Sequence, residues 1–333
     1  MDKSTDIQSG LFSRIRDSLP AHVSMVDDVA LLLGISNDSA YRRIRGDKAL
    51  SLQEAVALMD KYSISLDDFA GSDNGTVTFR ASFLDTKEYP FSQWLKQLLE
   101  FTEGAGANPE TEVIFILNEL SIFQLIQFPE LCAFKLFFWQ KSNLGFEELR
   151  ESKFSLGYCD EANSNLCKEI AMRYVKIKTS EFTTAECLNS FLKQILFYNE
   201  AGYFESPGDA RGLCHRLHQL VDHFCKQAEL GYKYIYGGNE AGQAGNFDLY
   251  HNDIILADNT VLIRTGDTGT SFITSNAINL MQSQNADFFK YNYRWGQNLR
   301  TRSVLISGTA ERERNRFFRN LHHQVDRVEE KLS

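Results

Sequence analysis

Four basic side chains within seven residues carry the clearest chemistry in this sequence. They are Arg42, Arg43, Arg45 and Lys48. Arginine and lysine bind phosphate oxygens, and the arginine fork also pairs with guanine in the DNA major groove. Nearby, Asn37 is a residue type that pairs with adenine, and Tyr41 suits a thymine methyl group or a phosphate. The predicted DNA contacts are Ser36, Asn37, Ser39, Tyr41, Arg42, Arg43, Arg45 and Lys48.

These residues need a frame that presents them, and residues 26–46 predict two short helices joined by a tight turn. Gly34 can adopt the left-handed conformation that ends a helix. Ser36 offers a hydroxyl to the free N–H groups at the start of the next helix. Ala40 and Ile44 lie four residues apart and predict its inward face. The polar and basic residues then occupy the opposite face, which is the face that enters a major groove.

Residues 10–70 resemble the Cro/phage-repressor (XRE-type) helix-turn-helix. A small residue stands four positions before the turn glycine, as Ala30 does before Gly34. Where the family usually has an aliphatic residue this chain has Arg43, and Ile44 supplies an aliphatic side chain one position later. The resemblance implies a bacterial transcription regulator whose second helix, rotated by this shift, reads operator DNA.

The charge balance opposes DNA binding at first sight. The net charge of the chain is −9, and residues 1–72 hold 8 Lys or Arg against 11 Asp or Glu, which gives 8 − 11 = −3. Salt screens fields beyond about 8 Å, so local placement of the basic cluster decides the outcome. We expect modest non-specific affinity for DNA.

Other candidate chemistry is weak. Cys214 and Cys225, with three histidines between them, lie about 16 Å apart if they share one helix, too far for a common metal ion. The six cysteines are scattered singly, as free buried thiols are. Catalytic and phosphate-loop motifs are missing. We expect no metal, no cofactor and no enzymatic activity.

The predicted fold is α+β and mostly α. An N-terminal helix-turn-helix bundle of four to five helices is followed by a larger helical domain that ends in a small sheet with helices. The predicted domains are 1–72, with a linker at 71–75, then a mainly helical domain at 76–232 and a sensing or oligomerisation domain at 233–333. Whether 76–333 is one domain or two stays open.

Within the larger part, the apolar run 112–117 predicts a buried strand. The helix expected from Pro129 is apolar nearly all round, so it forms core or lines a ligand pocket. Two strands, 247–256 and 260–264, predict a hairpin around residues 258–259. The further predicted helices are 91–99, 163–176, 181–200, 206–230, 287–300 and one after Thr309. The apolar stripe of the last helix, Phe317 to Leu332, packs within the chain or on a twin helix.

These observations together predict a cytoplasmic DNA-binding transcription regulator with a C-terminal effector-sensing or dimerisation region. The expected partners are double-stranded DNA, a second copy of the chain and a small-molecule effector. No terminal signal peptide is visible, and the apolar region 113–139 is too interrupted to span a membrane. The alternatives are a protein-interaction adaptor whose helix-turn-helix no longer binds DNA, and an enzyme with a DNA-targeting module.

Overall fold

A computed structural model describes residues 3–19, 23–62, 64, 76–81, 91–239, 246–252, 259–275 and 279–332. The chain divides into two compact units, Met1–Phe79 and Arg80–Ser333. The predicted linker at 71–75 lies outside the described residues.

The described residues of the first unit form a bundle of four helices around a small apolar core. The helices are α1 (Lys3–Ser18), α2 (Met25–Leu33), α3 (Asn37–Ile44) and α4 (Leu52–Tyr62). Leu11 and Ile15 of α1 pack with Val29 of α2, Ala40 of α3 and Leu58 of α4. Leu11 and Ile15 lie four residues apart, so they share one apolar face of α1.

The second unit contains both helices and strands. Its α-helices are α5 (Phe91–Gly106), α6 (Ile122–Leu125), α7 (Pro129–Phe138), α8 (Glu161–Tyr174), α9 (Asn189–Glu200), α10 (Pro207–Leu230), α11 (Ala286–Thr301) and α12 (Glu311–Glu329). Its strands are β1 (Arg80–Ala81), β2 (Thr111–Ile116), β3 (Lys178–Thr183), β4 (Phe247–His251), β5 (Thr260–Thr265), β6 (Thr268–Ser275), β7 (Asn279–Ser283) and β8 (Val304–Leu305). Short turns of other helix types are η3 (Trp139–Asn143), η4 (Glu147–Leu149), η5 (Leu156–Tyr158) and η6 (Glu330–Leu332).

Within the residues that the structure describes, one mixed sheet of eight strands runs through this unit in the order β1-β7-β6-β5-β2-β3-β4-β8. Strands β2, β3 and β4 are parallel, and the other neighbours are antiparallel. The predicted class, α+β and mostly α, is consistent with the structure, but the prediction of only a small sheet at the end of a helical domain is wrong. The larger sheet forms through long-range pairing, because strands from both halves of residues 80–333 join it.

The same pairing removes the predicted division near residue 232. Strand β3 lies before that position and β4 after it, yet the two pair in parallel from Thr179–Phe247 to Thr183–His251. Residues 80–333 form one compact unit rather than the predicted domains 76–232 and 233–333.

The predicted hairpin is also wrong. Strands β4 and β5 are not neighbours, because β2 and β3 lie between them in the sheet. Strand β5 pairs instead with β2 and with β6. The predicted turn falls partly on residues 253–258, which lie outside the described residues.

Strand β3 lies in the centre of the sheet. The helix predicted at 181–200 would begin within this strand, but α9 begins only at Asn189. The sequence of β3 is polar, but its side chains are buried with partners. The Ser180 hydroxyl donates to Glu112 Oε1 at 2.8 Å, and Thr179 Oγ1 accepts from Lys233 Nζ at 2.7 Å. Glu181 accepts a hydrogen bond from the Tyr174 hydroxyl. Satisfied polar groups of this kind can occupy a core that apolar patterning does not reveal.

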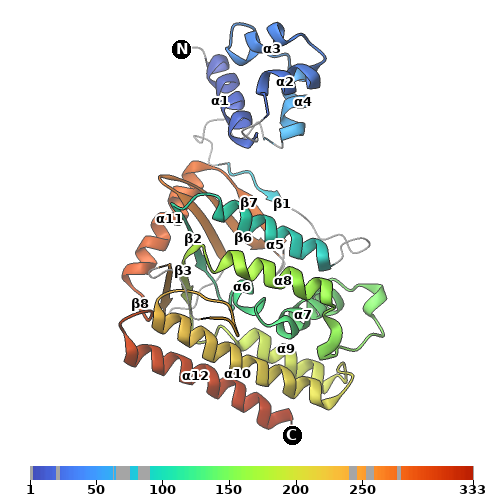
Figure 1. Ribbon diagram of the computed structural model, residues 1–333, viewed down its shortest axis with the longest axis vertical. Helices are drawn as coiled ribbons and strands as arrows, with labels where there is room; N and C mark the ends of the chain where they lie inside the picture. Colours follow the sequence, from blue (N-terminus) through green and yellow to red (C-terminus); the bar gives the residue numbers. More distant parts are fainter. Residues whose placement is uncertain are drawn as a thin grey trace. The chain divides into compact units, whose positions relative to one another are not determined.

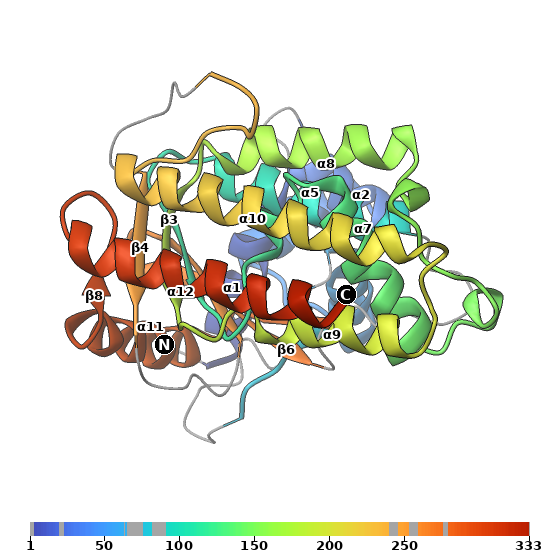
Figure 2. The same ribbon diagram turned by 90° about the horizontal axis from the view of Figure 1, so that it is seen from below.

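Helices cover both faces of the sheet, as Figures 1 and 2 show for α11 on one side of β3 and β4 and for α8 and α10 on the other. The side chains of β2 alternate accordingly. Val113 and Phe115 join the core with α5 and α8, whereas Ile114 and Ile116 join the core with Phe289 of α11.

Helix α12 packs within the chain. Phe317, Leu321 and Val325 from its stripe are buried in the core that α12 shares with α9 and α10. Of the two alternatives for this stripe, the structure shows the internal one. Over the part of the chain that is described, no helix has both the length and the apolar content that crossing a membrane requires.

Candidate nucleic-acid interface

The turn between α2 and α3 forms as its residue types predict. Gly34 has φ +63°, and its N–H closes the end of α2 onto Ala30 and Leu31 carbonyls. Ser36 caps α3, with its hydroxyl accepting from the Ser39 N–H at 3.3 Å. A glycine that ends one helix and a serine that begins the next fix the direction of α3.

Two of the predicted contact residues have structural roles at this start of α3. Ser36 uses its hydroxyl in the cap, and the Asn37 side-chain amide donates to Asp27 Oδ1 of α2 at 2.7 Å. Both side chains remain exposed, and Ser39 is half-buried. The pair Asn37–Asp27 therefore braces α3 on α2 and engages one of the carboxylates that would repel a phosphate.

Arg43 does not lie on the outward face of α3. It is only 4% exposed, on the inner side with Ala40, and Ile44 is partly buried beside the same core. Its guanidinium forms a two-pronged ion pair with Glu54 of α4, Nη2 to Oε1 at 2.6 Å and Nε to Oε2 at 3.1 Å. Its Nη1 donates to the Ser39 carbonyl at 3.1 Å. The prediction that Arg43 contacts DNA is corrected, because its donors are used inside the bundle.

Glu54 is engaged on both sides. It accepts from the Ser51 N–H at 2.9 Å, and the Ser51 hydroxyl accepts from the Glu54 N–H at 3.2 Å, so the two residues form a capping box at the start of α4. The hydrogen bond from Arg43 is the main cause that lowers the pKa of Glu54, so this carboxylate stays ionised.

Another carboxylate of the unit is neutralised away from α3. Asp28 Oδ1 accepts from Lys61 Nζ at 2.8 Å, and its other oxygen accepts from the Tyr62 hydroxyl. The Lys61 hydrogen bond, followed by that of Tyr62, lowers the pKa of Asp28. Three of the eleven acidic residues in 1–72, Asp27, Asp28 and Glu54, therefore have partners within the bundle.

The outward face of α3 is left to four of the predicted residues. Tyr41 is 50% exposed, and Arg42, Arg45 and Lys48 are exposed as well. Arg45 lies over the Tyr41 ring at 5.7 Å, and its 3.8 Å ion pair with Asp47 is solvent-exposed and therefore weak. Among the described residues, no side chain forms an ion pair or a hydrogen bond with the Arg42 guanidinium. We name this surface, Tyr41, Arg42, Arg45 and Lys48, the α3 outer face.

A residue of α1 that the sequence analysis did not single out holds the end of the α3 outer face. The Gln8 amide nitrogen donates to the Arg43 carbonyl at 2.7 Å and to the Lys48 carbonyl at 2.9 Å. Its oxygen accepts from the Leu50 N–H at 3.0 Å. Three hydrogen bonds from one side chain fix the loop that carries Arg45 and Lys48. No local pattern marks Gln8, since its partners lie 35 to 42 residues further on.

The histidines and cysteines of residues 214–225, considered above as metal ligands, do not face a common point in the second unit. Cys214 is buried in the core, while His218 of α10 meets His322 of α12 with 2.7 Å between their Nδ1 atoms. Across the described ranges, no three His, Cys, Asp or Glu side chains are gathered to hold a metal ion.

Comparisons of this chain with protein-family models, with curated proteins and with solved structures gave no match.

Proposed function

We propose that this protein is a cytoplasmic DNA-binding transcription regulator that reads operator DNA with the α3 outer face. The observation that carries the proposal is the separation of charge on α3. Arg43 is turned inward onto Glu54, while Arg42, Arg45 and Lys48 are exposed around a helix whose start is capped and braced. A short helix with exposed cations on its outer side is suited to the major groove.

Within this proposal, Arg42 and Arg45 pair with guanine or phosphate and Lys48 contacts a phosphate. Tyr41 packs on a thymine methyl group or a phosphate. One α3 offers few contacts, so useful affinity requires two copies on half-sites about 34–36 Å apart. We therefore propose a homodimer whose contacts lie in residues 80–333.

The test is a gel-shift titration on DNA fragments selected by the purified full-length protein. Arg42→Ala/Arg45→Ala should weaken specific binding at least a hundredfold, because two guanidiniums are lost from each half-site. The matched control is Arg312→Ala/Arg319→Ala, which removes two exposed arginines from α12. Equal affinity of the α3 variant and the wild type would reject the proposal, and a monomer at micromolar concentration in sedimentation would reject the dimer.

A second candidate function is a protein-interaction adaptor. It is favoured by exposed apolar side chains in the first unit, Leu31 at 81%, Leu52 at 73% and Val56 at 48%, the last two four residues apart on α4. Exposed apolar side chains at that spacing suit a protein partner. This function predicts association that Leu52→Ser/Val56→Ser abolishes and that salt leaves unchanged, whereas DNA binding weakens steeply with salt.

A further inference from the structure

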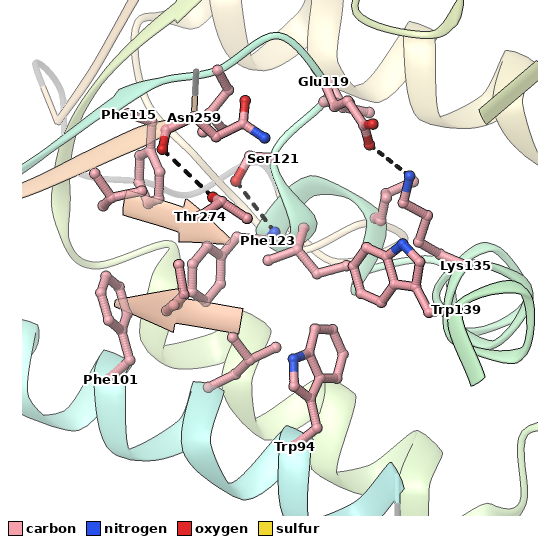
Figure 3. Close-up of a pocket in the computed structure, with 17 residues that line it drawn as sticks. Trp94, Phe101, Phe115, Glu119, Ser121, Phe123, Lys135, Trp139, Asn259 and Thr274 are labelled. Carbon is pink, nitrogen blue, oxygen red and sulfur yellow. Dashed lines mark hydrogen bonds and ion pairs between the residues drawn. The ribbon is translucent and has the colours of Figure 1, made fainter. Parts of the chain in front are cut away.

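The second unit contains a cavity of about 120 Å³ between α5, the segment that leads into α6, and the end of α7, with strands β2, β5 and β6 on the remaining side. Figure 3 shows its two ends. Lys135 and Glu119 lie at one end beside the indole of Trp139, and Phe101 and Phe115 lie toward the other. The rim includes Glu119 and Leu280, each 37% exposed, so solvent reaches the opening.

Apolar side chains form most of the wall, and five of them carry aromatic rings. Trp94 and Trp139 meet edge to face with their centroids 5.8 Å apart, and Phe101 and Phe123 stack at 5.5 Å. Phe115 closes the same wall at 5.8 Å from Phe123. An apolar cavity of about 150 Å³ holds benzene, and this one is smaller but opens to solvent at its rim, so a single ring is the upper limit for what it holds. The size and the walls of this cavity therefore select a ligand with a body of about one ring.

A buried ammonium group defines the polar end. The Lys135 side chain is 3% exposed and donates to Glu119 Oε2 at 2.6 Å. An ammonium group has three N–H donors, and among the described residues Glu119 is the only acceptor that Lys135 reaches. The Trp139 ring, at 5.3 Å, offers it a π face but no oxygen. Buried donors without an acceptor are unfavourable, so a ligand oxygen at this end would be stabilised.

The charge at this end selects the kind of oxygen. Burial raises the pKa of Glu119, but the charge and hydrogen bond of Lys135 outweigh it and hold the pKa below its usual value. Glu119 is therefore ionised and already neutralises Lys135. A second carboxylate would be repelled by Glu119, whereas a carbonyl or hydroxyl oxygen accepts from Lys135 without adding charge.

We propose that this cavity binds a small neutral molecule with an apolar body of about one ring and one carbonyl or hydroxyl oxygen that accepts a hydrogen bond from Lys135. If the proposed function holds, such a ligand is the effector that controls DNA binding, and that part of the inference rests on the proposed function. The binding itself does not, and the experiment below contains no DNA, so the two proposals fail separately.

The experiment titrates full-length protein with acetophenone, toluene and benzoate and follows tryptophan fluorescence. Two of the three tryptophans, Trp94 and Trp139, line the cavity, so the Trp295→Phe background reports mainly on them. We expect saturable binding of acetophenone, with toluene about tenfold weaker because it lacks the acceptor. We expect benzoate to bind more weakly than acetophenone.

Two variants assign the polar end. Lys135→Met should weaken the binding of acetophenone about tenfold, to the affinity of toluene, and should leave the affinity for toluene unchanged. Glu119→Gln keeps Lys135 and removes the competing charge, so benzoate should then bind more tightly than acetophenone. If Lys135→Met does not fold, Glu119→Gln still tests the proposal. Equal affinities for acetophenone and toluene, tighter binding of benzoate by the wild type, or no saturable binding of any probe would overturn it.

Discussion

The Arg43 guanidinium and the Glu54 carboxylate join the end of α3 to the start of α4 through two parallel hydrogen bonds. Glu54 also caps α4 through Ser51, so a single carboxylate fixes both helices. Such a planar pairing suits arginine in a way that lysine does not reproduce. It follows that Arg43 stabilises the first unit, whereas no side chain of the described residues pairs with the guanidinium of its neighbour Arg42.

Arg43→Ala should destabilise the first unit by about 2 kcal/mol, because Glu54 is left partly buried without its partner. Arg42→Ala should leave the stability unchanged. Hydrogen–deuterium exchange of the amides in residues 37–48 measures the difference locally, since all three tryptophans lie in the second unit. Arg43→Leu/Glu54→Gln should recover most of the loss, because glutamine still caps Ser51 and leucine fills the inner position. Faster exchange in Arg42→Ala than in Arg43→Ala would contradict this assignment.

Lys48→Gln should weaken DNA binding to a similar extent on every sequence and reduce its salt dependence. Each phosphate contact contributes about −0.9 to the slope of log affinity against log salt, so losing one contact per protomer should reduce the slope of a dimer by about 2. Affinities measured at several salt concentrations on specific and random DNA give both slopes. The expectation fails if Lys48→Gln changes only the preferred sequence and leaves the slope intact.

Gln8→Ala should loosen the loop after α3, since three hydrogen bonds to Arg43, Lys48 and Leu50 disappear together. At about 1 kcal/mol each before relaxation, we expect a loss near 2 kcal/mol in the stability of the first unit. DNA affinity should fall as well, although Gln8 lies outside the α3 outer face. Gln53→Ala on α4, an exposed glutamine, is the matched control. Wild-type exchange rates at residues 45–50 in Gln8→Ala would refute the role of this side chain.

His223 should make the second unit sensitive to acid. Burial lowers its pKa to about 4 from 6.5, so it is neutral in the folded protein. Between pH 6.5 and 4, His223 binds a proton in the unfolded chain but not in the folded protein. The contribution of neutral, buried His223 to the free energy of unfolding is therefore complete above pH 6.5 and is lost as the pH falls toward 4. The loss reaches roughly 3 kcal/mol.

The measurement for His223 is urea unfolding from pH 7 to pH 4, followed by tryptophan fluorescence. His223→Gln should flatten the curve over that window relative to the wild type, whatever its absolute stability. Carboxylates that titrate in the same pH range contribute equally to the unfolding free energies of both proteins, so their contribution cancels in the difference. Parallel curves for the two proteins would show that His223 is not the group responsible.

Local signals in the sequence were sufficient for many of the helices. Gly34 with φ +63° and the Ser36 cap formed as predicted. The helix predicted at 206–230 forms as α10, Pro207–Leu230, between the Ser206 cap and Gly231. Pro129 begins α7, whose residues 131–137 are all buried. The groups that decide these features lie within a few residues of one another, so the local sequence is enough to predict them.

Position 43 shows where local signals fail. A charge on a short helix is expected to face solvent, and only the arrival of Glu54 from α4 turns Arg43 inward. Two facts in the sequence could have indicated it: Arg43 lies three residues after the buried Ala40, and Glu54 belongs to a capping box nearby. The same reasoning applies to the cavity, whose lysine on α7 meets its counter-ion Glu119 only when α7 is placed against the segment before α6.

The sequence by itself determined where several helices begin or end, and which stretch carries the exposed cations, because caps, turn glycines and apolar periods act over one or two helical turns. The tertiary structure decided the eight-stranded sheet, the burial of the polar strand β3 and the inward turn of Arg43. In each of these the deciding partner comes from another element, often far along the chain, as β5 pairs with β2 from Thr265–Thr111 onward. Pairing energies of that kind depend on which surfaces meet in space, and the order of residues along one segment does not contain them.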